Sequence, residues 1–331
     1  MDSTLPKVSI LIPVYNRANM VGGCIQSALE QTYQDIEVVV VDNDSTDGTW
    51  EICKALSEKD SRLRVFKNDT NIGPVGNWKK CIDSARGAYG KILFSDDLLS
   101  KDYVEKALPL LGDDVSFVFS SVKIGSDPAH AQIHYQWGKA ANTDAVLIDA
   151  GEYIKEVLMG FGALVSPGAA LFRLKDLKEN FIKELPSRKL HGFSYHGAGP
   201  DLLLFLLTAL QYKKVAHLPE PLVFFRKHDD SATTKALTQK NWPIRECYTQ
   251  SRLWFAENYL DNKMVSRLLA RAWLLEITAE RNFAYFMHPR GLANHFLKNP
   301  NKVSMFDFYF SLPILLIGAG WYTVKYNRSQ E

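Results

Sequence analysis

The N-terminal part of the chain alternates between short apolar runs and segments whose apolar residues recur at helical spacing. The apolar runs predict strands at Val8–Ile12, Ile36–Val41, Leu63–Phe66, Lys91–Phe94 and Val115–Phe119. The segments between them predict helices over Met20–Leu29, Thr49–Ser57, Pro74–Ala85 and Ser100–Leu110. We therefore expect an α/β fold with a mostly parallel sheet and helices on both faces. Ligands of such sheets bind beyond the carboxyl ends of the strands.

The pattern is less regular farther along the chain. Gly125–Asn142 is polar and predicts an irregular insertion. Further strands are expected at Ala169–Phe172 and Leu222–Phe225. Leu202–Leu210 predicts a helix that is apolar on every side and therefore buried. From Asn241 onward the pattern is helical and rich in Leu, Trp and Phe.

Composition excludes few classes of protein, but it indicates the kind of partner, the state of the cysteines and the cellular compartment. A formal net charge of +2 does not indicate a nucleic-acid partner. The four cysteines form no CxxC pair, and we interpret them as reduced core thiols: Cys24, Cys53, Cys81 and Cys247. The short polar segment before Val8 lacks the features of a signal peptide, and we expect a cytoplasmic protein.

The C-terminal stretch Phe308–Val324 carries no charged residue. It is shorter than the roughly 20 apolar residues of a membrane-spanning helix, it contains Pro313, and Lys325 and Arg328 follow it. Two interpretations stay open: contact or partial insertion of 304–326 at the inner face of the cell membrane, or a buried C-terminal helix. A full membrane span is the least favoured of the three possibilities.

Polar clusters follow three of the predicted strands, at Asp42–Asp47, Asn71–Asn77 and Ser95–Asp97. Most of the first cluster is explained by a capped turn, but Asp42 stands directly at the strand end, where a ligand contact is favoured. Asp96 and Asp97 are hard to explain as core residues. Carboxylates at this edge suit Mg²⁺ or Mn²⁺ bound to a phosphorylated ligand.

The order and spacing of these segments resemble family 2 glycosyltransferases over roughly Val8 to Ser231. The segments that carry the resemblance are Val8–Arg17, Val39–Thr49, Asn71–Gly73 with Asn77, and Ser95–Asp97. The resemblance implies the glycosyltransferase-A fold, a Rossmann-like, mostly parallel sheet flanked by helices. We predict a catalytic domain over 1–240, with a nucleotide-binding half at 1–112 and an acceptor half at 113–240. A helical C-terminal extension then occupies 241–331.

The resemblance also implies roles for individual residues in binding a nucleotide-sugar donor. The implied nucleotide contacts are Pro13, Tyr15, Arg17, Asp42, Asn71, Gly73, Asn77, Asp96 and Arg226. The implied ligands of Mg²⁺ or Mn²⁺ are Asp96, Asp97 and His228. The chain departs from the family pattern at Phe94, where the family usually has an Asp, and at Asn43, which replaces a frequent Asp. Which of Asp96 and Asp97 binds the metal stays open.

Asp201 follows Gly197–Pro200 and begins the apolar helix. A carboxylate in this position often caps the helix, but the family places its catalytic base here, and the resemblance implies that role for Asp201. Arg226 and His228 match the family's closing motif. His191 and His196 lie near Asp201 in the sequence and are candidates for contact with the acceptor.

Together these features predict an inverting transfer of a sugar from a nucleotide-diphosphate sugar, with UDP the expected nucleotide, to a hydroxyl acceptor. The expected acceptor is a glycan or a lipid-linked saccharide in surface polysaccharide synthesis. A nicotinamide-dependent dehydrogenase is disfavoured because no Gly-x-Gly-x-x-Gly follows the first strand. A non-catalytic sugar- or nucleotide-binding protein on a decayed transferase fold remains an alternative, since Phe94 replaces an acid.

Overall fold

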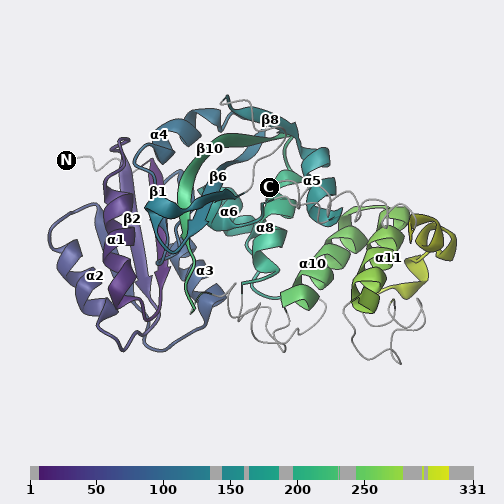
Figure 1. Cartoon of the computed structure of the whole chain (residues 1–331), viewed down its shortest axis with the longest axis horizontal. Coiled ribbons are helices and arrows are strands. Elements are labelled where there is room, and N and C mark those ends of the chain that lie inside the picture. The colour runs from purple at the N-terminus through teal and green to yellow at the C-terminus, as the bar shows by residue number, and fades with distance from the viewer. Residues whose placement is uncertain are drawn as a thin grey trace.

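The structure, a computed structural model, describes residues 7–134, 144–159, 164–185, 197–229, 231, 244–278, 293 and 297–312. Figure 1 shows a twisted sheet with its covering helices at one end of the molecule and a row of helices at the other.

The strands are β1 Val8–Val14, β2 Ile36–Asp42, β3 Leu63–Lys67, β4 Tyr89–Ile92, β5 Leu98–Leu99, β6 Val115–Gly125, β7 Gln132–His134, β8 Val146–Asp149, β9 Ala170–Arg173 and β10 Lys214–Arg226. The α-helices are α1 Ala18–Leu29, α2 Thr49–Ser57, α3 Pro74–Ser84, α4 Tyr103–Ala107, α5 Ala150–Met159, α6 Leu174–Asn180, α8 Pro200–Ala209, α10 Ile244–Tyr259 and α11 Asn262–Thr278. Short 3₁₀ turns are η1 Leu108–Leu110, η2 Pro128–His130, η3 Pro167–Ala169 and η4 Pro300–Lys302.

The strands form one sheet in the order β3-β2-β1-β4-β9-β6-β10-β5, with β7 beside β6 and β8 beside β10. Strands β3, β2, β1 and β4 are parallel, as the alternating pattern predicts. Strand β9 then pairs antiparallel with both β4 and β6, and β10 runs parallel to β6. The α/β prediction is therefore confirmed, with a sheet that changes from parallel to mixed at β9.

Two hydrophobic clusters cover the two faces of the sheet, and the alternation along each strand decides which residue enters which cluster. In β1, Ile10 and Ile12 pack with α1, whereas Leu11 enters the cluster that contains α3 and α8. In β2, Val38 and Val40 share the first face with the even-numbered residues of β1. Successive side chains of a strand point to opposite faces, so these continuous apolar runs match burial on both sides.

The predicted buried helix is confirmed as α8, all of whose residues are buried. The cluster around α8 continues into α10 and α11, so the first two helices of the predicted extension share a core with the sheet. Figure 1 shows α8 and α10 side by side between the sheet and α11, and the two helices are in direct contact.

Two sequence expectations need correction. The strand expected at Leu222–Phe225 is the last part of β10, which begins at Lys214. Pro219 and Pro221 interrupt the apolar pattern, so the sequence does not predict the first half of this strand. The register with β6 is irregular around Pro221, because proline cannot donate a ladder hydrogen bond. The insertion expected to be irregular begins within β6 and contains η2 and β7, while 135–143 lie outside the described residues.

Residues 305–312 form a short helix at the end of the described chain. Phe308 is buried in the core, whereas Phe306, Tyr309 and Phe310 are 76%, 54% and 59% exposed. Within the described part of the chain, no helix is both long and apolar enough to cross a bilayer. The rest of the apolar stretch, from Pro313 to Val324, lies outside the described residues.

Candidate active site

The loops that follow β1 and β2 are joined by hydrogen bonds. The backbone N–H groups of residues 16–18 donate to the side chains of Ser45, Thr49 and Asp47 at distances of 2.8–3.0 Å. Asp47 also accepts from the backbone of Thr49 at 3.1 Å, so the predicted turn before α2 is present, while the N-cap of the helix is Gly48 and has no side-chain cap. This bonding fixes the loop from Tyr15 to Arg17 against the end of β2, and Tyr15 remains 44% exposed.

Asp42 ends β2 and has no exposed surface. Its two carboxylate oxygens accept hydrogen bonds from the hydroxyl and the backbone N–H of Ser45, at 2.5 and 3.1 Å. In this conformation Asp42 shapes the turn. A nucleotide can contact its carboxylate only if the residues around it move, so its nucleotide role stays a prediction.

Asn77, on the first turns of α3, is buried and binds the ends of two strands. Its side-chain N–H groups donate to the carbonyl oxygens of Val41 (2.9 Å) and Val14 (3.4 Å), and its carbonyl oxygen accepts from Asn68 at 3.0 Å. The sequence predicts Asn77 as a pocket residue; the structure places it behind the strand ends, where it binds the carbonyl of Val41 and adds a second, longer bond to that of Val14, which also accepts from the N–H of Asn43.

Asn43 organises the loop after β3. Its side chain donates to Asn71 at 2.8 Å and accepts from the backbone of Ile72 at 3.0 Å. Asn71 also accepts from the N–H of Gly73 at 2.9 Å, and Gly73 has φ +77°, which favours glycine. Ile72 is 47% exposed beside these polar groups, and the sequence alone did not mark it as a site residue.

The acidic turn after β4 meets the end of β10. The backbone N–H of Arg226 donates to Asp97 at 2.9 Å, and its guanidinium Nε donates to the carbonyl oxygen of Asp96 at 3.0 Å. His228 Nε2 lies 2.9 Å from Asp96 Oδ2. Asp96 and Asp97 thus form one polar cluster with Arg226 and His228, which lie about 130 positions later in the sequence.

Burial dominates the electrostatics of this cluster. It raises the pKa of Asp97 well above its ordinary value, and the neighbouring charge of Asp96 raises it further, while the Arg226 N–H and Lys91 act in the opposite direction. Lys91 in β4 is fully buried, and burial lowers its pKa to about 7. Its ammonium donates to the carbonyl oxygens of Gly168 and Ile92. The strand pattern gave no sign that this lysine lies beneath the acidic turn.

The donor atoms of the cluster suit a hard divalent cation. No group of three or more His, Cys, Asp or Glu side chains within the described ranges is arranged to hold a metal alone. Mg²⁺, however, is commonly held by one or two carboxylates together with phosphate oxygens of a substrate. Asp96 and His228 present an oxygen and a nitrogen side by side, and a cation beside them would relieve the repulsion between Asp96 and Asp97. The residues therefore fit a metal that is shared with a diphosphate.

Asp201 lies at the start of α8 with both oxygens bonded. Oδ1 accepts from the backbone N–H groups of Gly199 (2.8 Å) and Leu202 (2.6 Å), and Oδ2 accepts from the hydroxyl of Tyr248 at 2.6 Å. Burial raises the pKa of Asp201 to about 6, and these donors, with Tyr248 first, act against the rise. The side chain therefore binds backbone N–H groups at the start of α8, whose N-cap is Gly199, and also has the pKa of a base that works near neutrality.

An aromatic contact connects the segment of Asp201 with that of Asp96. The Trp78 ring lies 5.0 Å from the Phe94 ring, centroid to centroid. Gly197 packs so closely on the other part of Trp78 that a Cβ atom there would lie 2.5 Å from the indole. Phe94, the departure from the family pattern, thus provides packing in place of a carboxylate. His191 and His196, the candidate acceptor contacts, lie outside the described residues.

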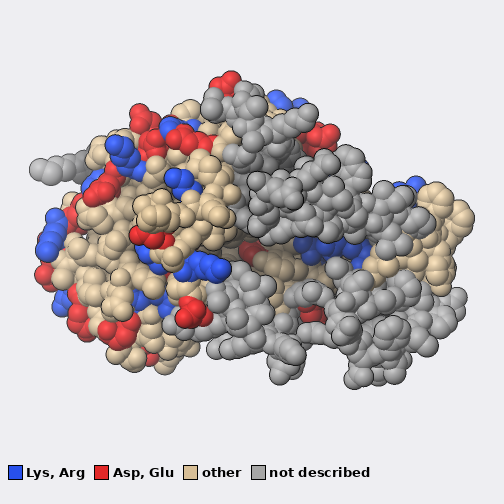
Figure 2. Space-filling view, in the orientation of Figure 1, with Lys and Arg blue, Asp and Glu red and all other residues tan. Residues whose placement is uncertain are grey.

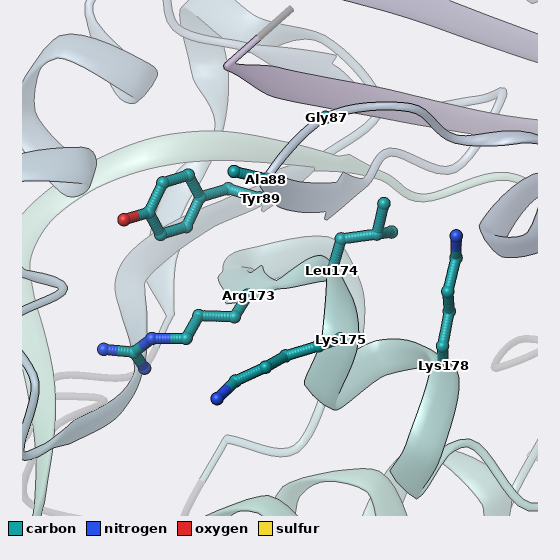
Figure 3. Close-up of a pocket in the computed structure, with 7 residues that line it drawn as sticks. All are labelled: Gly87, Ala88, Tyr89, Arg173, Leu174, Lys175 and Lys178. Carbon is teal, nitrogen blue, oxygen red and sulfur yellow. The ribbon is translucent and has the colours of Figure 1, made fainter. Parts of the chain in front are cut away.

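Figure 2 shows acidic and basic side chains interspersed over the described surface of the sheet end on this face. A hollow of about 410 Å³ lies at the amino end of β4, away from the acidic turn, and its lining includes Tyr89, Arg173, Lys175 and Lys178. In Figure 3 Lys178 extends away from Arg173 and Lys175, so the three cations do not converge on one point. This hollow has none of the predicted site residues.

Comparison with known proteins assigns the family. The family model described as glycosyl transferase family 2 matches residues 9–181, so the chain belongs to this family. The chain is 38% identical over 104 residues to an uncharacterized glycosyltransferase of Haemophilus influenzae. The matched segment is 31% of this chain and 42% of that protein. It is 36% identical over 98 residues to the glycosyltransferase GlyG of Streptococcus pneumoniae, and this segment is 30% of this chain and 33% of that protein. The matches thus span less than half of these relatives.

A solved structure extends the likeness over almost the whole chain. The crystal structure of S. aureus TarS 1–349 in complex with UDP-GlcNAc superposes with a TM-score of 0.64 at 17% sequence identity, and covers 98% of this chain and 92% of that one. At this identity the likeness concerns the fold. It confirms the glycosyltransferase-A architecture that the sequence motifs predict.

The Gly197–Trp78 contact gives a prediction with a matched control in Gly48. Both glycines have positive φ, +73° and +92°, but a Cβ at Gly48 would meet nothing within 4 Å. Gly48→Ala should lower the free energy of unfolding by about 1–2 kcal/mol through backbone strain. Gly197→Ala should lower it by about 1–3 kcal/mol more, because the new methyl group overlaps Trp78. Urea unfolding measures both, and equal losses would contradict a tight contact.

Proposed function

We propose that this protein is an inverting, metal-dependent glycosyltransferase that moves a sugar from a UDP-sugar to a hydroxyl group of a saccharide acceptor. The observation that carries the proposal is the acidic cluster of Asp96, Asp97, Arg226 and His228, joined through Trp78 to the buried carboxylate Asp201. Family membership supports the reaction class. The complex of TarS with UDP-GlcNAc supports a uridine nucleotide.

The nucleoside would bind at the ends of β1, β2 and β3. Tyr15 and Ile72 are exposed apolar side chains on the loops after β1 and β3, and they flank the end of β2, where Asn43 lies. An exposed aromatic ring and an aliphatic side chain can pack on the faces of a base. Asn71, which is exposed next to Ile72, offers polar groups to the base edge or the ribose.

The diphosphate would bind at the turn after β4. Arg226 lies against this turn, where a guanidinium can pair with phosphate oxygens. Asp96, His228 and, beside them, Asp97 would hold Mg²⁺ or Mn²⁺, which when bound offsets the charge that develops on the leaving diphosphate.

Asp201 would accept the proton of the acceptor hydroxyl. As that proton transfers to the carboxylate, the acceptor oxygen bonds to the anomeric carbon, and the bond from this carbon to the diphosphate oxygen breaks. Attack opposite the leaving group inverts the anomeric configuration. With a pKa of about 6, most of the Asp201 carboxylate is ionised at neutral pH and can act as a base. The same pKa lies close enough to neutral pH for the carboxylate to hold the proton that it accepts.

We further propose that the acceptor is a glycan or a lipid-linked saccharide of surface polysaccharide synthesis, reached at the inner face of a membrane. Phe306, Tyr309 and Phe310 are three exposed aromatic residues on a short helix, and the rings of Phe306 and Phe310 stack 5.9 Å apart. Aromatic side chains of this kind insert at the boundary of lipid head groups and acyl chains. Lys298, exposed just before this helix, suits an anionic surface.

A thermal-shift experiment tests the donor class. UDP with Mn²⁺ should raise the unfolding temperature by several degrees, because a ligand that binds only the folded state stabilises it. GDP and dTDP under the same conditions should raise it less, and UDP without Mn²⁺ should raise it less than with the metal. Equal shifts for the three nucleotides would contradict a uridine-specific site.

Asp201→Asn should lower turnover by about 10²–10⁴-fold and leave nucleotide binding intact, because the amide cannot accept the proton. In the wild-type enzyme, activity should rise with pH through about 6 and then level, since Asp201 is protonated below its raised pKa. Asp176→Asn is a matched control, because Asp176 is also buried and bonded to a tyrosine, Tyr212. Near-normal turnover of the Asp201 variant would remove Asp201 from this role.

The membrane contact predicts binding to vesicles of phosphatidylglycerol and phosphatidylcholine in a flotation assay. Replacing Phe306 and Phe310 together with Ser should reduce the bound fraction at least about tenfold, because two apolar side chains no longer leave water. Ile133→Ser, at a similarly exposed apolar residue on β7, should leave binding unchanged. If the double variant binds as the wild type does, this helix is not the contact.

A further inference from the structure

The helical extension reaches the site of the proposed base. Tyr248 lies on the second turn of α10, in the part of the chain that the sequence separates from the catalytic domain. Its hydroxyl donates to Asp201 Oδ2 at 2.6 Å, across the packed pair of helices α8 and α10. Helical periodicity in the sequence does not reveal this contact.

The two oxygens of Asp201 are not equivalent. A carboxylate offers about four lone-pair sites, two on each oxygen. Oδ1 already accepts from two backbone N–H groups, those of Gly199 and Leu202, which fill its sites. Oδ2 accepts only from Tyr248 among the described residues and keeps one site for another donor. The atom that can receive a proton from an acceptor is therefore Oδ2, the oxygen that Tyr248 contacts.

Tyr248 is held in place from a third helix. The guanidinium of Arg252, one turn along α10, lies 5.7 Å from the centre of the Tyr248 ring. Arg252 in turn donates through Nε to the carbonyl oxygen of Val157 in α5 at 3.0 Å. Burial, followed by the charge of Asp201, raises the pKa of Tyr248 well above its ordinary value, so the phenol stays protonated and remains a donor.

We propose that Tyr248 is a positioning residue for the proposed base: its hydroxyl stabilises the ionised carboxylate and turns the open site of Oδ2 toward the acceptor. The inference rests on Asp201 as the base. It implies that the C-terminal extension contributes to catalysis directly, beyond any role at a membrane.

Two other titratable groups act on Asp201 within the described ranges, and both lie on α10. Arg252 favours the ionised carboxylate through its charge, and its own pKa is lowered chiefly by burial. Cys247 has a pKa raised to about 11, chiefly by burial, and is neutral at the pH of the assay. Neither group is within hydrogen-bonding reach of Asp201 in the structure, so the hydroxyl of Tyr248 is the contact to remove.

The test is the pH dependence of UDP release from UDP-GlcNAc with Mn²⁺, or from the donor that the nucleotide screen identifies. In Tyr248→Phe the acid limb should move up by about one pH unit, because a hydrogen bond to the charged form is lost. Activity should therefore fall about tenfold near pH 5 and return toward the wild-type value above about pH 8. The KM for the donor should not change, since Tyr248 does not contact the nucleotide loops.

Tyr212→Phe is the matched control, because Tyr212 also donates to a buried aspartate, Asp176, through bonds of 2.9 and 3.2 Å. It should leave the acid limb in place. Replacing Tyr248 with 3-fluorotyrosine keeps the shape and makes the phenol a stronger donor, so it should move the acid limb down. Opposite shifts for the two Tyr248 variants distinguish an effect on Asp201 from a general loss of packing.

The outcomes separate this inference from the proposed base. If Asp201→Asn abolishes turnover but neither Tyr248 variant moves the acid limb, Asp201 stays the base and the positioning role is wrong. A uniform loss at every pH in Tyr248→Phe likewise overturns the positioning role. If Asp201→Asn turns over normally, both proposals fall.

Discussion

Two buried carboxylates, Asp97 and Asp201, determine how distant parts of this chain are joined. A charge removed from water is strongly destabilising unless hydrogen-bond donors replace the lost hydration. Asp97 receives the backbone N–H of Arg226 from the end of β10. Asp201 receives the N–H groups of Gly199 and Leu202 at the start of α8 and the hydroxyl of Tyr248 from α10. The elements that supply these donors are therefore fixed against the segments that carry the two carboxylates.

The sheet changes from parallel to mixed at β9, and this change decides which strand ends meet at the acidic turn. On the parallel side, the carboxyl ends of β1, β2 and β4 open at one edge, as in other open α/β sheets. Beyond β4 the antiparallel β9 separates this part from β6 and β10. Strand β10 then returns Arg226 to the same edge, next to the turn after β4. The end of the last long strand thereby meets the acidic turn of Asp96 and Asp97.

Hydrogen bonds and side-chain packing both stabilise the edge of the sheet where these strands end. Asn77 satisfies carbonyl oxygens at the ends of β1 and β2, while Trp78, the next residue, packs on Phe94 and Gly197. One turn of α3 thus fixes both the strand ends and the segment that leads to Asp201. Phe94 replaces an acid of the family pattern, and its ring has a structural role in this contact. The polar cluster beside it keeps the carboxylates of Asp96 and Asp97 and the imidazole of His228.

The sequence by itself determined the features that depend on neighbouring residues. Alternating apolar runs specify β1 to β4 and their helices, turn chemistry specifies the capped loop after β2, and the strand ends indicate where Asp96 lies, because these properties are local. The tertiary structure decided which distant groups meet: the antiparallel place of β9, the strand hidden by Pro219, the burial of Lys91, and the bond from Tyr248 to Asp201. Such contacts arise from the packing of helices and strands against each other, and periodicity along one segment holds no information about its partner in space.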